Sequence, residues 1–107
     1  MTAARLRSAG SPLTVDQMPV PTPGDGHVLV QVLACGVCGS DAHMARGAVP
    51  VRTMPIVLGH EAAGRIAACG PGVSRWKTGD AVIVRAGSVC GECRFCSAGA
   101  DNLCPEQ

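Results

Sequence analysis

The feature that most constrains this 107-residue chain is a run of four cysteines near its C-terminal end. The segment reads CGECRFCSAGADNLC, and the spacing C-x2-C-x2-C-x7-C separates Cys90, Cys93, Cys96 and Cys104. Four thiolates complete a closed tetrahedral zinc site, which leaves no open position for a substrate. The spacing therefore predicts a structural zinc ion, held in a loop whose tight backbone Gly91 and Gly99 permit.

An iron–sulfur cluster is the main alternative for this loop. Ferredoxin runs also have three cysteines at x2 spacing and a cysteine followed by proline. Here Cys104 and Pro105 lie too far downstream for that pattern, and the chain has no second cysteine run. A zinc ribbon for nucleic acid would need two separated C-x2-C pairs, and this loop is too compact for them. The spacing favours zinc.

Composition excludes several classes of protein. The formal net charge is +1 and no basic stripe is present, so we expect no nucleic-acid partner. No apolar run is long enough to span a membrane, and residues 1–17 lack the apolar core of a signal peptide. We therefore expect a cytoplasmic chain without a membrane partner. In that compartment seven cysteines favour metal binding over disulfides.

Short apolar runs separated by glycine and proline are typical of strands and turns. We predict a buried strand over residues 27–34, with Cys35 as a small buried residue at its end, and two further strands over residues 61–70 and 80–87. Gly64, inside the second strand, predicts a bulge or a close backbone approach. Because Trp76 and Phe95 are the only aromatic residues, the core must be aliphatic.

A short helix is predicted for residues 38–46, with Ser40 or Asp41 as its cap. Together these elements predict a small, mostly β, barrel-like domain with a cysteine-rich loop at its C-terminal end.

A second group of potential ligands spans LACGVCGSDAH and PIVLGHEAAG. A thiolate and an imidazole from separate elements, such as a cysteine and His60, can hold zinc with one position left open. Cys35 alone is usually a small buried side chain, and a single histidine is more often a turn or core residue than a ligand. Beside a second metal site, the combination favours a catalytic zinc site, and the residue chemistry leaves open whether Cys35 or Cys38 binds.

Polar residues beside these ligands can support proton transfer. Asp41 can orient a ligand histidine through its second ring nitrogen. Ser40 can relay a proton, and His43, three residues on, can pass it to solvent.

The chain resembles the zinc-dependent alcohol dehydrogenases of the medium-chain dehydrogenase/reductase superfamily over nearly its whole length. Four segments carry the resemblance, in the family's order: CGVCGSDAH, LGHEAAGRI, GPGVSRWKTGDAV and CGECRFCSAGADNLC. It implies that residues 1–107 form the N-terminal part of a GroES-like catalytic domain, a mostly β barrel with short helices and a zinc-binding loop, incomplete at its C-terminal end. It also implies a structural zinc lobe over residues 88–107.

The resemblance also assigns roles to residues. Cys38, rather than Cys35, is the implied catalytic zinc ligand, with His60 as the second ligand. Glu61 matches a glutamate that approaches the metal and can exchange with its bound water. Asp41 matches the carboxylate that holds His60. Ser40 matches the hydroxyl that relays the proton, and His43 matches the outer end of that relay. The ligands of the structural zinc match Cys90, Cys93, Cys96 and Cys104.

The implied activity is oxidation of a small alcohol or polyol to an aldehyde or ketone, with hydride transfer to NAD(P), in a homo-oligomeric parent enzyme. The chain contains no G-x-G-x-x-G motif after a strand, so we expect NAD(P) binding only with a further domain. The resemblance also implies that a third protein ligand to the catalytic zinc lies beyond these residues. We therefore expect a truncated or partial chain that is inactive in isolation. The alternatives are a non-enzymatic zinc-binding β-domain remnant and a zinc-free quinone-reductase relative; the latter is disfavoured by Cys38, His60 and the four-cysteine loop.

Overall fold

The structure is a computed structural model that describes residues 1–106; Gln107, the last residue of the predicted zinc lobe, lies outside the described residues. Strands outnumber helices, which confirms the mostly β class. The elements, in chain order, are β1 (Thr2–Arg5), β2 (Thr14–Gln17), β3 (Val28–Gly36), α1 (Gly39–Ala45), β4 (Glu61–Cys69), β5 (Ala81–Ile83), α2 (Arg94–Ser97) and the 3-10 turn η1 (Asp101–Leu103).

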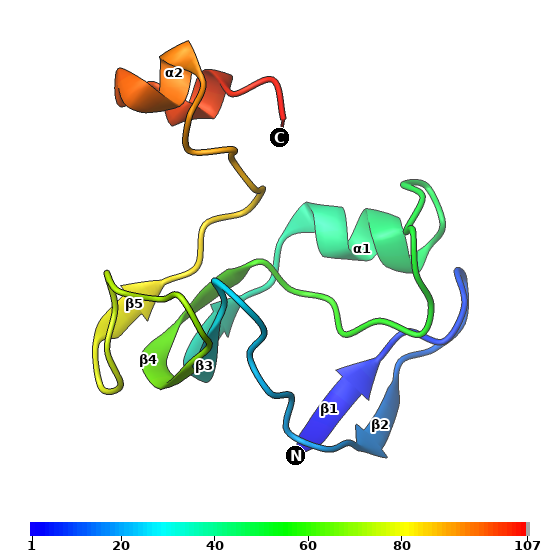
Figure 1. The fold of residues 1–107 in the computed structure, drawn as a ribbon. Helices are drawn as coiled ribbons and strands as arrows, with labels where there is room; N and C mark the ends of the chain where they lie inside the picture. Colours follow the sequence, from blue (N-terminus) through cyan, green and yellow to red (C-terminus); the bar gives the residue numbers. More distant parts are fainter. Residues whose placement is uncertain (107) are drawn as a thin grey trace.

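The strands form two antiparallel sheets (Figure 1). One is the β1–β2 pair, and the other has the order β3–β4–β5, with β4 in the centre. A single bridge between Leu6 and Ile56 ties the end of β1 to the segment that precedes β4. The cysteine-rich segment with α2 and η1 projects away from the three-stranded sheet (Figure 1).

Gly64 in β4 lies where the pairing with β3 is irregular. The register passes from Val32↔Gly64 to Ala34↔Ala63, so Leu33 of β3 bulges out of the ladder. A Cβ atom on Gly64 would lie 2.1 Å from the carbonyl oxygen of Gln31. The predicted close backbone approach at Gly64 is confirmed, and the bulged residue belongs to the opposite strand.

Two predictions about the strands are wrong. The strand predicted for residues 27–34 exists as β3, but it is half-buried at its start and exposed from Gln31 onward. Cys35, expected to be buried at its end, is also exposed. The strand predicted for residues 80–87 is shortened to Ala81–Ile83. The pairing of β1 with β2 was not predicted.

The core is aliphatic, as predicted, and it is small. Among the described residues, the buried hydrophobic side chains are those of Leu6, Ile66 and Cys104. Within residues 1–106 no helix has the length and apolar character needed to cross a membrane.

Candidate metal centres

The start of α1 places three of the predicted site residues. Cys38 is the N-cap, with extended backbone, and its N–H donates to Oδ2 of Asp41 at 3.0 Å. This bond closes the first turn from the third helical position, as in a capping box. The predicted cap at Ser40 or Asp41 is therefore wrong in position, because both residues lie inside the helix and Asp41 caps from there.

His60 directly precedes β4 and lies beside Ser40 and Asp41 of α1. Gly59, with φ +118°, turns the backbone just before it, and a Cβ on Gly59 would lie 3.2 Å from Sγ of Cys35. Nδ1 of His60 lies 3.3 Å from Oδ1 of Asp41. Its Nε2 lies 3.3 Å from Oγ of Ser40 and 4.0 Å from Oε1 of Glu61. Nδ1 thus lies near the Asp41 carboxylate, while Nε2 lies near the Ser40 hydroxyl and the Glu61 carboxylate.

Cys38, His60 and Glu61 form the first donor cluster. One ligand atom from each residue lies within 4.8 Å of those of the other two. A hydrogen bond from Ser40 lowers the pKa of the Cys38 thiol, and a hydrogen bond with Cys38 raises the pKa of His60. Sulfur, nitrogen and oxygen donors are the set that zinc takes when one position stays open. The chemistry of this cluster fits a zinc ion.

The four cysteines form the second donor cluster. The Sγ–Sγ distances are 3.6 Å for Cys93–Cys96, 3.7 Å for Cys104–Cys90 and 4.0 Å for Cys90–Cys96. A tetrahedron with zinc–sulfur bonds of about 2.3 Å has edges of about 3.8 Å, so the sulfurs already have the spacing that zinc needs.

The backbone around the four cysteines also favours thiolate ligands. The N–H of Cys93 points to Sγ of Cys90 at 3.3 Å, and the N–H of Cys90 to Sγ of Cys104 at 3.4 Å. Hydrogen bonds from the backbone of Glu92 and Cys93 lower the pKa of Cys90 to about 7. Burial raises the pKa of Cys96 to about 12. In the absence of metal the cluster holds its protons unevenly, and a cation is what would stabilise four thiolates together.

A cavity of about 400 Å³ opens beside the first cluster. Ser40, Asp41 and His60 give it polar groups, and its other lining residues are apolar or small: Met44, Ile56, Val57, Leu58, Gly59, Ala86 and Gly87. Concave apolar sites with few polar groups are typical of small-molecule sites. Ile56 and Ala86 could not be predicted as lining residues, because such side chains have no distinctive chemistry and only the fold brings them here.

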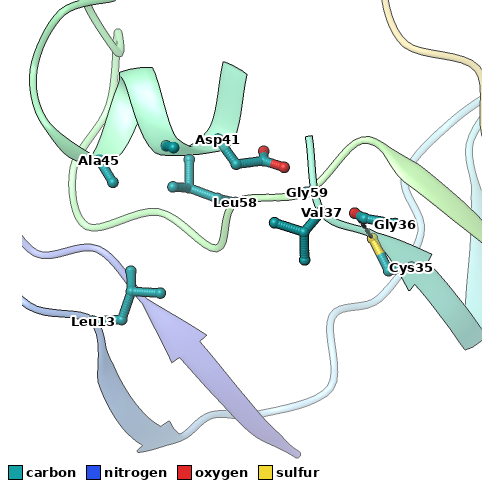
Figure 2. A pocket seen from close by; sticks show the side chains of 9 residues that line it. Leu13, Cys35, Gly36, Val37, Asp41, Ala45, Leu58 and Gly59 are labelled. Carbon is teal, nitrogen blue, oxygen red and sulfur yellow. Dashed lines mark hydrogen bonds between the residues drawn. The ribbon is translucent and has the colours of Figure 1, made fainter. Parts of the chain in front are cut away.

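A second cavity, of about 390 Å³, shares Asp41, Leu58 and Gly59 with the first as lining residues (Figure 2). Leu13, Val37 and Leu58 surround it, and Cys35 lies at one end (Figure 2). Cys35 hydrogen-bonds only the adjacent Gly36 carbonyl among the described residues, and it is outside the first donor cluster.

His43 lies on the exposed side of α1. Within residues 1–106 its ring makes no hydrogen bond to Ser40, although three-residue spacing puts both on adjacent positions of the helix surface. The structure therefore brings together Cys38, Ser40, Asp41, His60 and Glu61, and it leaves His43 at the surface.

A mostly β domain with a donor cluster open to a cavity and a closed four-cysteine cluster defines the zinc alcohol dehydrogenase type of GroES-like domain. The profile of the alcohol dehydrogenase GroES-like domain matches residues 24–107, and the chain belongs to this family. The GroES-like fold predicted from the sequence is thereby confirmed.

The names of similar proteins are consistent with this family assignment. The alcohol dehydrogenase of Rhizobium meliloti strain 1021 is 45% identical over 109 residues, which cover 100% of this chain and 32% of the relative. The sorbitol dehydrogenase of Bacillus subtilis strain 168 is 43% identical over 88% of this chain and 28% of its own length. The cobalt- and zinc-bound thermostable alcohol dehydrogenase from Pyrobaculum aerophilum superposes with a TM-score of 0.89, at 37% identity, over 98% of this chain and 32% of that structure. The chain thus spans about a third of the length of these relatives.

Proposed function

We propose that this chain supplies the metal-binding part of the catalytic domain of a zinc-dependent alcohol dehydrogenase. The observation that carries the proposal is the convergence of Cys38, His60 and Glu61 beside an apolar cavity, in a fold that also has a four-cysteine cluster. The parent reaction would be oxidation of a small alcohol or polyol to an aldehyde or ketone in a cytoplasmic homo-oligomer.

Within this proposal each residue has a defined task. A zinc ion held by Cys38, His60 and Glu61 would act as a Lewis acid that lowers the pKa of an alcohol hydroxyl. Oδ1 of Asp41 lies 3.3 Å from Nδ1 of His60 and would hold a proton on that nitrogen, which leaves the Nε2 lone pair for the metal. Ser40, beside Nε2, is placed to accept the substrate's proton, and His43 would pass it to solvent.

The residues present do not fit a dinucleotide. The chain contains no G-x-G-x-x-G motif, so we derive no step through NAD(P) from this chain. What supports NAD(P) as the acceptor in the parent enzyme is the similarity to solved structures named as an NAD-dependent alcohol dehydrogenase and as a putative zinc-binding dehydrogenase bound to NADP.

Metal analysis tests the proposal directly. The purified chain is expected to contain two zinc ions, and the Cys38→Ala and Cys104→Ala variants one each, because each substitution removes a ligand from a different cluster. Cobalt substitution adds a second readout, since thiolate–cobalt bands should persist in both variants at reduced intensity. Unchanged zinc content in Cys38→Ala would remove this residue from the catalytic site. Zinc in the four-cysteine cluster alone would favour the non-enzymatic zinc-binding domain.

A further inference from the structure

One wall of the cavity beside the first donor cluster belongs to a segment without regular secondary structure. Ala86 and Gly87 line this cavity together with Ser40 and His60. Residues 84–90 form neither helix nor strand, and within residues 1–106 no backbone–backbone hydrogen bond involves residues 85–89. A Cβ atom on Gly87 would meet nothing within 4 Å, so no packed neighbour holds the chain at this point. The position of the wall therefore depends on what holds the two ends of the segment.

The end nearer to the sheet is held by β4. The N–H of Val84, the residue after β5, donates to the carbonyl oxygen of Ala62 at 2.7 Å. Ala62 lies in β4, two residues after His60. This attachment uses no residue of the zinc lobe, so it should persist whether or not the four-cysteine cluster holds a metal.

The other end is held by the zinc lobe. Cys90 follows Gly87 by three residues, and three residues span at most about 11 Å. The N–H of Cys90 points to Sγ of Cys104 at 3.4 Å, and the N–H of Cys104 donates to the carbonyl oxygen of Asp101 at 3.0 Å. The Asp101 carboxylate pairs with Arg85, which directly precedes the wall. That exposed pair adds little stability, but it shows that the lobe lies against the segment that carries the wall.

The order of the lobe depends on its metal. Helix α2 has four residues and η1 three, and these elements contact each other rather than the sheets. Helices this short need an external constraint, which a metal bound by four thiolates supplies. The ligands of the first cluster lie elsewhere, at the start of α1 and at the start of β4. Loss of metal from the lobe should therefore release the wall without removing a ligand from the first cluster.

We propose that the metal of the four-cysteine cluster fixes the Ala86–Gly87 wall of the cavity beside the first cluster. The proposal rests on the proposed function, because it gives the closed cluster a task at the substrate cavity. With the lobe ordered, both ends of residues 84–90 are held and the wall stays beside His60. Without metal in the lobe only the Val84 end is held, so the cavity loses this wall while the first donor cluster remains. The lobe is thus an ordering element that positions the cavity wall.

Two ligands that differ only in an apolar tail test this role in the cobalt-loaded chain. Imidazole and 4-butylimidazole present the same ring nitrogen to the open position of the first cluster, and only the butyl group extends into the cavity. The shift of the cobalt bands measures each dissociation constant. In the wild type the tail should lower the dissociation constant by at least about tenfold, because it buries methylene groups against the walls. In Cys104→Ser this gain should fall below about threefold, while the dissociation constant of imidazole stays within about twofold of wild type.

A longer connection between the wall and the lobe separates positioning from folding. Two glycines inserted between Ser88 and Val89 leave every ligand of both clusters in place, so the variant should bind two metal ions and still lose the gain from the tail. The matched control carries the same two glycines between Ser74 and Arg75, two exposed residues of the loop between β4 and β5. The control should keep the gain, with metal content and far-UV circular dichroism equal to those of the first insertion variant.

The outcomes distinguish failure of this inference from failure of the proposed function. A gain from the tail that is equal in the wild type, Cys104→Ser and the insertion after Ser88 would overturn the inference, as would the absence of any gain in the wild type. In both cases imidazole still binds the metal of the first cluster, so the proposed function stands. Cobalt bands that do not respond to imidazole, or that respond equally in Cys38→Ala, would contradict the proposed function and the inference with it.

Discussion

Asp41 joins the local fold to the candidate catalytic site through its two carboxylate oxygens. Oδ2 accepts the backbone N–H of Cys38, which fixes the start of α1. Oδ1 is buried, has no geometrically complete hydrogen bond within the described chain, and lies 3.3 Å from Nδ1 of His60. A buried carboxylate oxygen is costly without a donor, so the proton of His60 belongs on Nδ1. That tautomer leaves the lone pair of Nε2 free for the metal.

The first prediction follows from this arrangement. Asp41→Asn should weaken zinc binding at the first cluster about ten- to a hundredfold, because an amide cannot hold the Nδ1 proton of His60 as a carboxylate does. Competition with a chromophoric chelator measures this affinity. Asp80→Asn is the matched control, since Asp80 accepts the N–H of Lys77 by a similar bond outside both clusters. Equal zinc affinity in Asp41→Asn and the wild type would contradict the role given to Asp41.

The second prediction concerns pH. In the metal-free chain the pKa of His60 is raised above 6.5 by its hydrogen bond with Cys38, and that of Cys38 is lowered below 9.0 by Ser40. Zinc requires neutral imidazole and thiolate. As pH falls from about 8 to about 6, protons compete increasingly with zinc for Cys38 and His60, so zinc affinity at this cluster should fall and proton release on binding should rise. Calorimetric titration of Cys104→Ala in buffers of different ionisation enthalpy measures both quantities. An affinity that is constant over this range would contradict the prediction.

Residues with distinctive chemistry could be predicted from the sequence, and residues without it could not. Thiols and an imidazole have few common roles, so the spacing of Cys90–Cys104 and the pairing of Cys38 with His60 pointed to metal before the fold was known. The choice of Cys38 over Cys35 came from the family resemblance, since both are cysteines in one turn. Ile56 and Ala86 line the cavity only because distant segments meet there.

At the scale of elements, strong local signals located the elements but not their limits. The Val- and Leu-rich run of β3 and the glycine-bounded run of β4 were recognisable, as was α1. The β1–β2 pair was not, because TAAR and TVDQ are four-residue strands that each contain a charged residue and show little apolar periodicity. Their pairing rests on contacts between segments, including side-chain bonds of Arg7 to Thr14 and Asp16, which propensity does not report.

The third prediction tests the close approach in the β3–β4 ladder. Gly64→Ala should destabilise the chain by about 1–3 kcal/mol, because its Cβ would overlap the Gln31 carbonyl and force the strands apart. The urea midpoint of unfolding measures the loss. Gly24→Ala makes the same substitution where a Cβ would meet nothing within 4 Å, and its midpoint should stay near that of the wild type. A Gly64→Ala midpoint as high as that of Gly24→Ala would exclude the steric account.

The fourth prediction concerns the zinc lobe. Helix α2 has four residues and η1 three, and these two elements pack on each other rather than on the sheets. Helices this short do not persist without an external constraint. Removing zinc with a chelator should therefore abolish amide protection over residues 90–104 while the β3–β4 amides stay protected.

Hydrogen exchange followed by mass spectrometry resolves the two regions. Cys104→Ser should reproduce the effect without chelator, and Cys69→Ser, a change in a cysteine outside both clusters, should not. The ion pair between Arg85 and Asp101 links the lobe to the segment after β5, but both side chains are exposed and such a pair contributes little. Loss of protection confined to the lobe is therefore the expected pattern. Simultaneous loss of protection in β3 and β4 would show that the lobe and the sheets unfold together.

At the scale of the whole molecule, burial was the least predictable property. An apolar run predicts that a strand can be buried, but burial requires a second layer, and the described chain covers little of β3. The composition predicted an aliphatic core, and Leu6 and Ile66 confirm its type while leaving it small. What packs on a surface is decided by the arrangement of elements, which local sequence does not encode.

The last prediction is that the zinc-loaded chain alone does not oxidise alcohols with NAD or NADP. Both donor clusters are present, but hydride transfer also needs a nicotinamide held at the cavity, and the chain has no dinucleotide motif and spans about a third of its relatives. Binding and orientation of the cofactor supply much of the rate of such a reaction. Absorbance of the reduced nicotinamide, followed with ethanol, a longer primary alcohol and sorbitol, should show no rise above buffer at high chain concentration. The full-length Rhizobium meliloti alcohol dehydrogenase, under the same conditions, is the control for the assay. Steady reduction that scales with the chain and disappears in Cys38→Ala would show that these 107 residues suffice for turnover.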